Sequence, residues 1–510
     1  MRRSAPSLPT CCLLLLLAIT SGLEAQRSTP RRGGRLGGRL PANGAPAVAR
    51  VADPPLSVLL GRPTDRSITV NLLAAEALEA VVRYGTRPGA LTQRTPASRL
   101  APGVPMELPI AGLAPDQRYV YQVEWRRADG APVREPPGSW QTQRARGQSF
   151  VFTVQGDSHP ERAGRMFDAT LYRQTLGHVQ AGNPDFHVLL GDDFSIERLI
   201  SRGALTGPAV DAVYAGQRLF LDRISRSTVV VPVNGNHEEA GRFLLDGTPT
   251  SAPVLAGLAR ARFFSPPAPD GFYTGDTVSI PHLGLPRDYF AWTWGDALFV
   301  VIDPYWHTPP TSPAMVPRGQ RDGREAGGGN AMQAAGVGRD LWQMTIGDAQ
   351  YAWLTRTLRT STAKWKFVFA HHVLGTGRGG VELADMAEWG GRDRQGEEAF
   401  RRFRPTWPLP IHQLFAATGV TIFFQGHDHL FARQVKDGVI YQSTPNPADP
   451  TYTAFNREAY RSGDILPNSG HLRVQVASDG VQVEYVRAFL PSPTDPAAAD
   501  GRVAFSYRVP

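Results

Sequence analysis

The sequence predicts an α/β fold that is preceded by a small all-β sandwich. Three observations lead to this prediction. From about residue 149 onward, short apolar runs alternate with helix-length segments, which is the pattern of α/β proteins. Five of the apolar runs end directly before a polar cluster that contains Asp, Asn or His. Between about residues 55 and 143, alternating runs are separated by turn signals and no helix interrupts them, which is typical of an antiparallel β-sandwich.

The first 25 residues have the pattern of a cleavable signal peptide. Arg2 and Arg3 precede an apolar run from Cys11 to Ile19, and small or polar residues follow as far as Ala25. The apolar run is much shorter than the ~20 residues of a membrane-spanning helix, and no later run is long enough to cross a bilayer. We therefore expect a secreted or periplasmic protein without a transmembrane segment. Both cysteines of the chain lie in this leader, so we expect no disulfide in the mature chain.

A basic tail is expected at residues 26–54. This segment is rich in Arg, Gly, Pro and Ala, a composition that favours disorder because it buries little apolar surface. The tail accounts for much of the formal net charge of +8. Aromatic and basic residues do not alternate there as they do in single-strand binding proteins, so no nucleic acid partner is expected.

The sandwich is predicted at residues 55–145, and the larger domain at residues 149–510. The expected sandwich strands are 67–72, 80–84, 106–110 and 119–125. The segment from Gly112-Leu113 to Tyr119-Val120-Tyr121 resembles a fibronectin type III-like domain. In the larger domain, strands are expected at 149–155, 186–190, 228–233, 365–370 and 420–424, and helices at 165–180, 348–360 and 411–418. After Leu430, runs at 438–441, 471–476 and 481–486 are expected to complete a second sheet, and 503–509 to add an edge strand.

The polar clusters that follow five of the strands supply ligands for metal ions. They are Asp157-Ser158-His159, Gly191-Asp192, Gly235-Asn236-His237-Glu238, His371-His372 and Gly426-His427-Asp428-His429. The ends of successive strands meet at one rim of a sheet, so we expect these side chains to converge. Carboxylate, amide oxygen and imidazole suit hard or borderline cations, and the mature chain offers no thiolate for a cysteine site.

These five clusters, in this order, resemble the calcineurin-like metallophosphoesterases from about Ser149 to about Ala488. The resemblance implies a four-layer α-β-β-α sandwich that holds two metal ions. We expect Fe, Mn or Zn, because the ligand types do not select sharply among these metals. A fibronectin type III-like domain precedes the catalytic domain in the purple acid phosphatases of this superfamily. Carried over by residue, the resemblance implies one metal held by Asp157, His159 and His429, a second held by Asn236, His371 and His427, and Asp192 as the bridge.

Two of the implied ligand positions have a neighbouring residue that could serve instead. Asp193 competes with Asp192 for the bridge, and His372 competes with His371 as ligand. The resemblance makes His237 the group that faces the phosphate and protonates the leaving oxygen, and Glu238 is expected to orient its ring. Asp428 is expected to point away from the metals if the backbone there is extended.

The resemblance implies a hydrolase that cleaves phosphate esters by attack of a hydroxide that bridges two metals. A phosphomonoesterase is favoured, with a small phosphate ester as substrate. The alternatives are a phosphodiesterase, including the cyclic-nucleotide type, and a non-catalytic binding protein on the same fold. Purple acid phosphatases carry a Tyr ligand three residues after the bridging Asp, but Ser195 stands at that position, so a purple Fe(III) centre is not expected.

Some of the remaining features are interpreted as structural, and for others the sequence leaves the role open. His178, His187, His282 and His307 have no motif around them, and His412 is interpreted as a packing or surface residue. The aromatic residues at 289–306 indicate strand and core. A run of arginines between Arg392 and Arg404 suits either an anionic substrate or a solvated helix face. The long insertions at 304–347 and 375–410 are expected to shape access to the site.

Overall fold

The computed structural model describes residues 54–308, 341–375, 378–491 and 499–510. The predicted signal peptide, nearly all of the predicted tail and most of the 304–347 insertion lie outside these residues. Among the described residues, no helix is long and apolar enough to cross a membrane.

The amino-terminal part is a β-sandwich, as predicted. Its two sheets are antiparallel throughout. The first has the order β1 (Leu56–Gly61), β2 (Ser67–Ala74), β6 (Met106–Ala111). The second has the order β4 (Gln93–Arg94), β3 (Leu78–Gly85), β7 (Arg118–Arg126), β8 (Val133–Arg134), with β5 (Ser98–Leu100) on β3 and β9 (Gly138–Gln141) on β7. Along β7, buried and partly exposed residues alternate, because one face of the strand lies on the core.

Two large mixed sheets follow. The first has the order β12 (Val229–Pro232), β11 (Phe186–Leu189), β10 (Phe150–Gln155), β21 (Gly470–Ala477), β22 (Gly480–Arg487), β23 (Val503–Val509). The second has the order β13 (Thr274–Gly275), β14 (Phe290–Trp294), β15 (Ala297–Val301), β16 (Trp365–Phe369), β17 (Ile422–Gln425), β19 (Val439–Ser443), β18 (Phe431–Lys436), β20 (Asp464–Leu466). The prediction that the three runs after Leu430 share one sheet was wrong. β19 pairs with β17, whereas β21 and β22 extend the other sheet from β10, and a strand's own sequence does not specify its neighbour.

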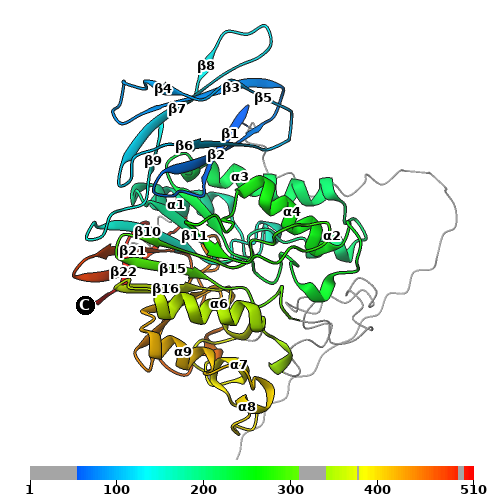
Figure 1. Cartoon of the computed structure of the whole chain (residues 1–510), viewed down its shortest axis with the longest axis vertical. Helices are drawn as coiled ribbons and strands as arrows, with labels where there is room; N and C mark the ends of the chain where they lie inside the picture. The colour runs from blue at the N-terminus through cyan, green and yellow to red at the C-terminus, as the bar shows by residue number, and fades with distance from the viewer. Residues whose placement is uncertain (1–53, 309–340, 376–377, 492–498) are drawn as a thin grey trace, which may run out of the picture. The chain divides into compact units, whose positions relative to one another are not determined.

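Helices cover both outer faces. They are α1 (Ala169–Ala181), α2 (Glu197–Ser201), α3 (Gly207–Ser225), α4 (Ala252–Phe264), α6 (Gly347–Thr360), α7 (Ala387–Gly390), α8 (Phe400–Phe403) and α9 (Ile411–Thr418). Figure 1 shows α1, α3 and α4 on one side of the stacked sheets and α6 and α9 on the other. One core joins α1, α3 and α4 to β11 and β12, and another joins α6 and α9 to β15 and β16.

Aromatic side chains fill the space between the two sheets. The ring of Phe152 on β10 lies 5.2 Å from that of Phe299 and 5.3 Å from that of Phe367. Each sheet is therefore buried on both faces, which explains why the central strands are continuous apolar runs. The predicted four-layer α-β-β-α sandwich is confirmed.

Helix α1 begins later than predicted. The sequence predicted its start at Arg165, but the helix starts at Ala169. The side chain of Asp168 accepts hydrogen bonds from the backbone N–H groups of Thr170 and Leu171, both at 2.8 Å. This N-cap fixes the first turn because it satisfies N–H groups that have no partner within the helix.

The sandwich is joined to the layered part by a buried arginine. Arg218 of α3 is 1 % exposed, and its Nη1 donates to Asn71 Oδ1 on β2 at 2.6 Å. It also donates to the carbonyl of Ser57 on β1. The described residues from 54 onward form one compact unit, and the boundaries predicted between the two domains stay a prediction.

Candidate metal centre

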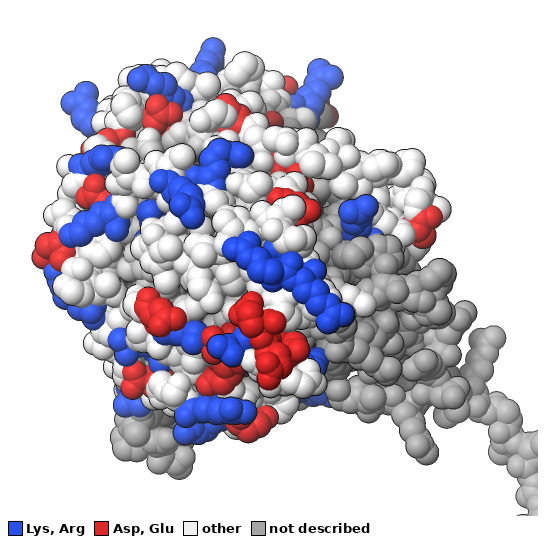
Figure 2. All heavy atoms as spheres, turned by 60° about the horizontal axis from the view of Figure 1, so that its bottom comes forward, with Lys and Arg blue, Asp and Glu red and all other residues white. Residues whose placement is uncertain are grey.

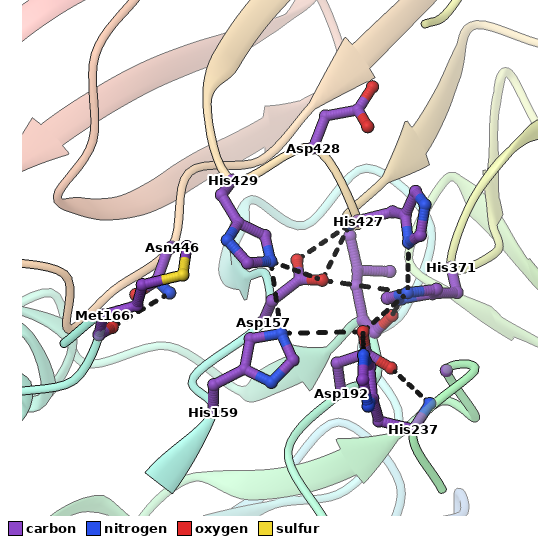
Figure 3. A network of polar contacts seen from close by, with 12 residues as sticks. Asp157, His159, Met166, Asp192, His237, His371, His427, Asp428, His429 and Asn446 are labelled. Carbon is purple, nitrogen blue, oxygen red and sulfur yellow. Dashed lines mark hydrogen bonds and ion pairs between the residues drawn. The ribbon is translucent and has the colours of Figure 1, made fainter. Parts of the chain in front are cut away.

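The predicted ligands follow the ends of strands in both large sheets. β10, β11 and β12 are parallel and lead to Asp157, Asp192 and Asn236, and the parallel strands β16 and β17 lead to His371 and His427. Parallel strands present their carboxyl ends at the same edge. Both edges meet at one buried cluster, and Figure 3 labels all of its members except Asn236. We call it the central cluster; its members are Asp157, His159, Asp192, Asn236, His237, His371, His427 and His429.

The donor atoms of the central cluster converge in two groups. His159 Nε2 lies 3.2 Å from His429 Nε2, and Asp157 Oδ1 lies 3.5 Å from the same nitrogen of His429. His371 Nε2 lies 3.2 Å from Asp192 Oδ2. The same atom of His371 lies 3.1 Å from Asn236 Oδ1 and 3.2 Å from His427 Nδ1. The two groups contain the two ligand sets that the resemblance to the metallophosphoesterases implies, and their assignment to two metals stays a prediction.

This spacing fits metal ligation. Ligand atoms at about 2.0–2.1 Å from a tetrahedral zinc ion lie roughly 3.3–3.4 Å from one another. Two imidazole nitrogens such as those of His159 and His429 do not form a hydrogen bond when both rings are neutral and turn their lone pairs to one point. The residues present therefore fit two cations.

The backbone at the central cluster is strained. Four of its residues adopt left-handed conformations, with φ of 49° at His159, 59° at Asp192, 66° at His427 and 55° at His429. Non-glycine residues seldom adopt such angles, which occur mostly where function requires them.

Two glycines of the motifs make room for the carboxylates. A Cβ added at Gly235 would lie 2.4 Å from Asp192 Oδ1, and one at Gly426 would lie 2.8 Å from Asp157 Oδ2. The glycines in these motifs are therefore required by the close approach of backbone to ligand.

Charge in the cluster favours ionised carboxylates. Burial raises the pKa of Asp192, but the neighbouring rings of His371 and His237 outweigh it and hold the pKa well below its usual range. Burial likewise lowers the pKa of His371, but the negative charge of Asp192 raises it to about 10. A cation bound here would replace the protons that His371 holds in its absence.

His237 lies beside the predicted bridge, and its ring contacts other residues than expected. The backbone N–H of His237 donates to Asp192 Oδ1 at 2.8 Å. Its Nδ1 lies 2.9 Å from a carboxylate oxygen of Glu197, and its Nε2 lies 3.0 Å from Arg162 Nη2. Burial lowers its pKa, but Asp192 and Glu197 outweigh burial and raise the pKa to about 9.

The expectation that Glu238 orients the ring of His237 was wrong. Its carboxylate accepts hydrogen bonds from the backbone N–H groups of Gly235, Asp192, Asp193 and Phe194. Glu238 therefore fixes the backbone of the Asp192 turn against the Asn236 turn, and Glu197 contacts the ring instead. A contact between Glu197 and His237 depends on the position of α2, which the local sequence does not reveal.

The competitors have other partners. Asp193 Oδ1 accepts from Ser158 Oγ at 2.5 Å and from Gln155 at 3.0 Å, and burial raises its pKa well above the usual range. His372 stacks on the ring of His427, with centroids 4.0 Å apart. His371 instead lies within reach of Asp192 and Asn236. Asp193 is therefore held away from the bridge. A ligand atom of His372 lies within 4.8 Å of ligand atoms of His371 and His427, so the choice of His371 over His372 stays a prediction.

Asp428 points away from the central cluster, as predicted (Figure 3). Its carboxylate accepts from Tyr460, Arg378 and the backbone N–H of Gly379. The extended backbone that was expected to turn Asp428 away is not present, because the two flanking residues are left-handed rather than extended.

Of the two roles left open for the arginine run after Gly391, the contacts of Arg401 and Arg404 do not support binding of an anionic substrate. Arg404 donates to Glu388 and to the Trp342 carbonyl, and Arg401 donates to the carbonyls of Trp407 and Pro408. On the face that Figure 2 presents, basic and acidic side chains are interspersed. His412 is a packing residue, since it is 1 % exposed and bonds to Tyr441.

Two arginine side chains near the central cluster were not predicted from the sequence. Arg162 reaches His237, and Arg378 donates to the His427 carbonyl at 2.7 Å. Arg162 lies five positions after Asp157, in the turn that carries the first ligands, and that proximity was the available signal. Arg378 lies in an insertion whose path the sequence did not indicate.

Comparison with known proteins identifies the fold. No protein-family model and no curated protein matches this sequence. Among solved structures, the chain is similar to the purple acid phosphatase PPD1 from seeds of yellow lupin (Lupinus luteus), with 14 % identity and a TM-score of 0.53, over 88 % of this chain and 73 % of that chain. It is also similar to PhoD, with 14 % identity and a TM-score of 0.57, over 89 % of each chain. The resemblance to the metallophosphoesterases is thus confirmed at the level of the fold.

Proposed function

We propose that this protein is a metal-dependent phosphoesterase with two metal ions in the central cluster. One observation carries the proposal. Carboxylate, amide and imidazole donors from five strand ends converge in two groups with the spacing of metal ligands. The similarity in fold to a purple acid phosphatase supports the same conclusion.

The proposed ligands divide between the two groups. Asp157, His159 and His429 would hold one cation, Asn236, His371 and His427 the other, and Asp192 would bridge them. Iron, manganese and zinc all suit these donors. When bound, the two cations would lower the pKa of a water between them and neutralise charge on the phosphate.

His237 is proposed as the proton donor to the leaving oxygen. Its ring lies beside the bridge, with Nε2 3.9 Å from Asp192 Oδ2. Contact with Glu197 at Nδ1 favours a positively charged ring, whereas Arg162 Nη2, 3.0 Å from Nε2, can only donate and needs this nitrogen unprotonated. We propose that Nε2 carries the proton that a general acid needs once Arg162 has left it. Arg162 next to Nε2 would then move to the phosphate when a substrate occupies this side of the cluster.

Phosphomonoesters are the proposed substrate class. A monoester carries one more negative charge than a diester, and charge-assisted bonds from guanidinium groups reward that charge. Arg162, with its side chain 23 % exposed, supplies such a group next to His237. We further propose secretion or periplasmic export, which the apolar run after Arg2-Arg3 supports.

Hydrolysis of p-nitrophenyl phosphate tests the proposal. We expect turnover by the protein loaded with Mn²⁺, Zn²⁺ or Fe, and loss of turnover after chelation or in Asp192→Asn. Turnover of bis-p-nitrophenyl phosphate above that of the monoester at every pH would overturn the monoester assignment. Absence of turnover with all three metals on both esters would favour the non-catalytic binding protein.

A further inference from the structure

A second cluster of potential ligands lies outside the central cluster. It consists of Asp276, which follows β13, Asp288, which precedes β14, and His307, which lies in the loop after β15. One potential ligand atom from each of the three lies within 4.8 Å of the other two. We call this group the second cluster, and it shares no residue with the central cluster.

Asp288 is buried without hydrogen-bond donors. Its exposure is 0 %, and that of Asp276 is 1 %. Neither carboxylate oxygen of Asp288 accepts a hydrogen bond, and His307 Nε2 also lacks a hydrogen-bond partner, although it lies 3.3 Å from Asp288 Oδ2. A buried carboxylate whose oxygens accept no hydrogen bond is costly, and one ion pair with His307 leaves Oδ1 without any partner, so these atoms indicate a ligand that completes the site.

The surroundings add negative charge, and the nearest cationic group is His307 itself. Burial lowers the pKa of His307, but the charges of Asp288, Asp303 and Asp276 outweigh burial and raise it. Burial and then the charge of Asp288 raise the pKa of Asp276 to about 6. The carboxylate of Asp303 also lies close enough to Asp288 for the two negative charges to repel each other. The buried guanidinium of Arg260 donates to the carbonyls of Arg287 and Pro232. In the described part of the chain, neither Asp276 nor Asp288 forms an ion pair with a lysine or arginine.

We propose that the second cluster binds one divalent transition-metal cation of the Zn²⁺ or Mn²⁺ class. The ligands are carboxylate oxygens of Asp276 and Asp288 and Nε2 of His307, with water to complete the coordination. An imidazole ligand argues against Ca²⁺ and Mg²⁺, which prefer oxygen, and suits zinc or manganese. This inference goes beyond the proposed function and does not depend on it.

The role of this cation is structural. It joins the segment between β13 and β14 to the loop that follows β15. That loop also carries Asp303, whose Oδ2 accepts from Asn234 Nδ2 at 2.8 Å, two residues before Asn236. The cation therefore fastens the loop that supports the turn carrying a proposed ligand of the central cluster.

Metal content separates the two clusters. Full-length protein is stripped with EDTA, incubated with Zn²⁺, desalted and analysed for zinc per chain. We expect Asp288→Asn and His307→Ala each to bind one zinc fewer than wild type, and Asp270→Asn, an exposed aspartate before β13, to bind the same amount as wild type. Asp192→Asn loses zinc from the central cluster but keeps this one, so a failure of the proposed function is distinguishable from a failure of this inference. Equal zinc in wild type, Asp288→Asn and His307→Ala would overturn the site.

Thermal stability gives a second, independent test. In EDTA we expect Asp288→Asn to have a higher Tm than wild type, because it removes repulsion between buried carboxylates. With Zn²⁺ the order reverses, because only wild type binds the additional cation. If the two carboxyl groups instead share a proton, the order of the two Tm values is the same with and without Zn²⁺, and that result contradicts the proposal.

Discussion

The central cluster and the second cluster combine the same types of side chain, yet only one of them has a sequence motif. The ligands of the central cluster follow strand ends in chain order and stand beside glycines that make room for them. Asp276, Asp288 and His307 stand beside no recognisable motif. Where the backbone must approach a ligand closely, glycine is required beside the ligand, and this produces a recognisable motif. A site built from three loops requires only its three ligand side chains and leaves the neighbouring residues free to vary. The following predictions test the function proposed for the central cluster, and the metal-content and stability experiments above test the second cluster.

The largest effect is expected at Asp192. Asp192→Asn should remove more metal than either His427→Ala or His429→Ala, and it should abolish turnover. The reason is that the proposed bridge serves both cations, whereas each histidine serves one. Elemental analysis of the three purified variants measures this. Full metal content in Asp192→Asn would contradict the bridging role.

His237→Ala should keep the metals and lose turnover by roughly 10²–10⁴-fold, because a general acid contributes about that much. The loss should be smaller for esters with very good leaving groups, which need no proton. A series of aryl phosphates with different leaving-group pKa values measures the effect. Equal losses across the series would mean that His237 positions the phosphate and does not donate a proton.

Arg162→Ala should lower kcat/KM for p-nitrophenyl phosphate by about 10- to 100-fold, since hydrogen bonds to charged groups contribute roughly 1.5–3 kcal/mol. The loss should be smaller for the singly charged diester. Arg165→Ala, in the same turn, is the matched control. A uniform loss on both esters would show that Arg162 acts through His237 and not on the charge of the substrate.

The smallest effect is on stability. With a folded pKa of about 10, against about 6.5 in the unfolded chain, His371 contributes stability below about pH 6.5 that is lost as pH rises toward 10. Chelated protein should therefore lose stability over this window. Metal-loaded protein should instead lose its additional stability as pH falls, because protons compete for the ligands. Thermal melts across pH, with and without EDTA, measure the two slopes, and parallel slopes would contradict the exchange of protons for metal.

Predictions from sequence were accurate where local patterns dominate. Helix α9 (Ile411–Thr418) and the strands around Phe152 and Val368 formed where apolar periodicity placed them. The start of α1 was wrong because the cap at Asp168 was not recognised. The same limit applies to the site, because the ring of His237 contacts a glutamate from another element rather than its chain neighbour.

By itself, the sequence predicted which donor types meet in the central cluster, because each proposed ligand stands two to four residues after the end of the strand that positions it. It also determined the layered α/β class, since strands buried on both faces must be continuous apolar runs. Only the tertiary structure decided the sheet to which β21 and β22 belong, the contacts of Arg162 and Glu197 with His237, and the existence of the second cluster. These depend on which distant segments pack together, and packing is decided by the burial of whole surfaces rather than by the residues of any one segment.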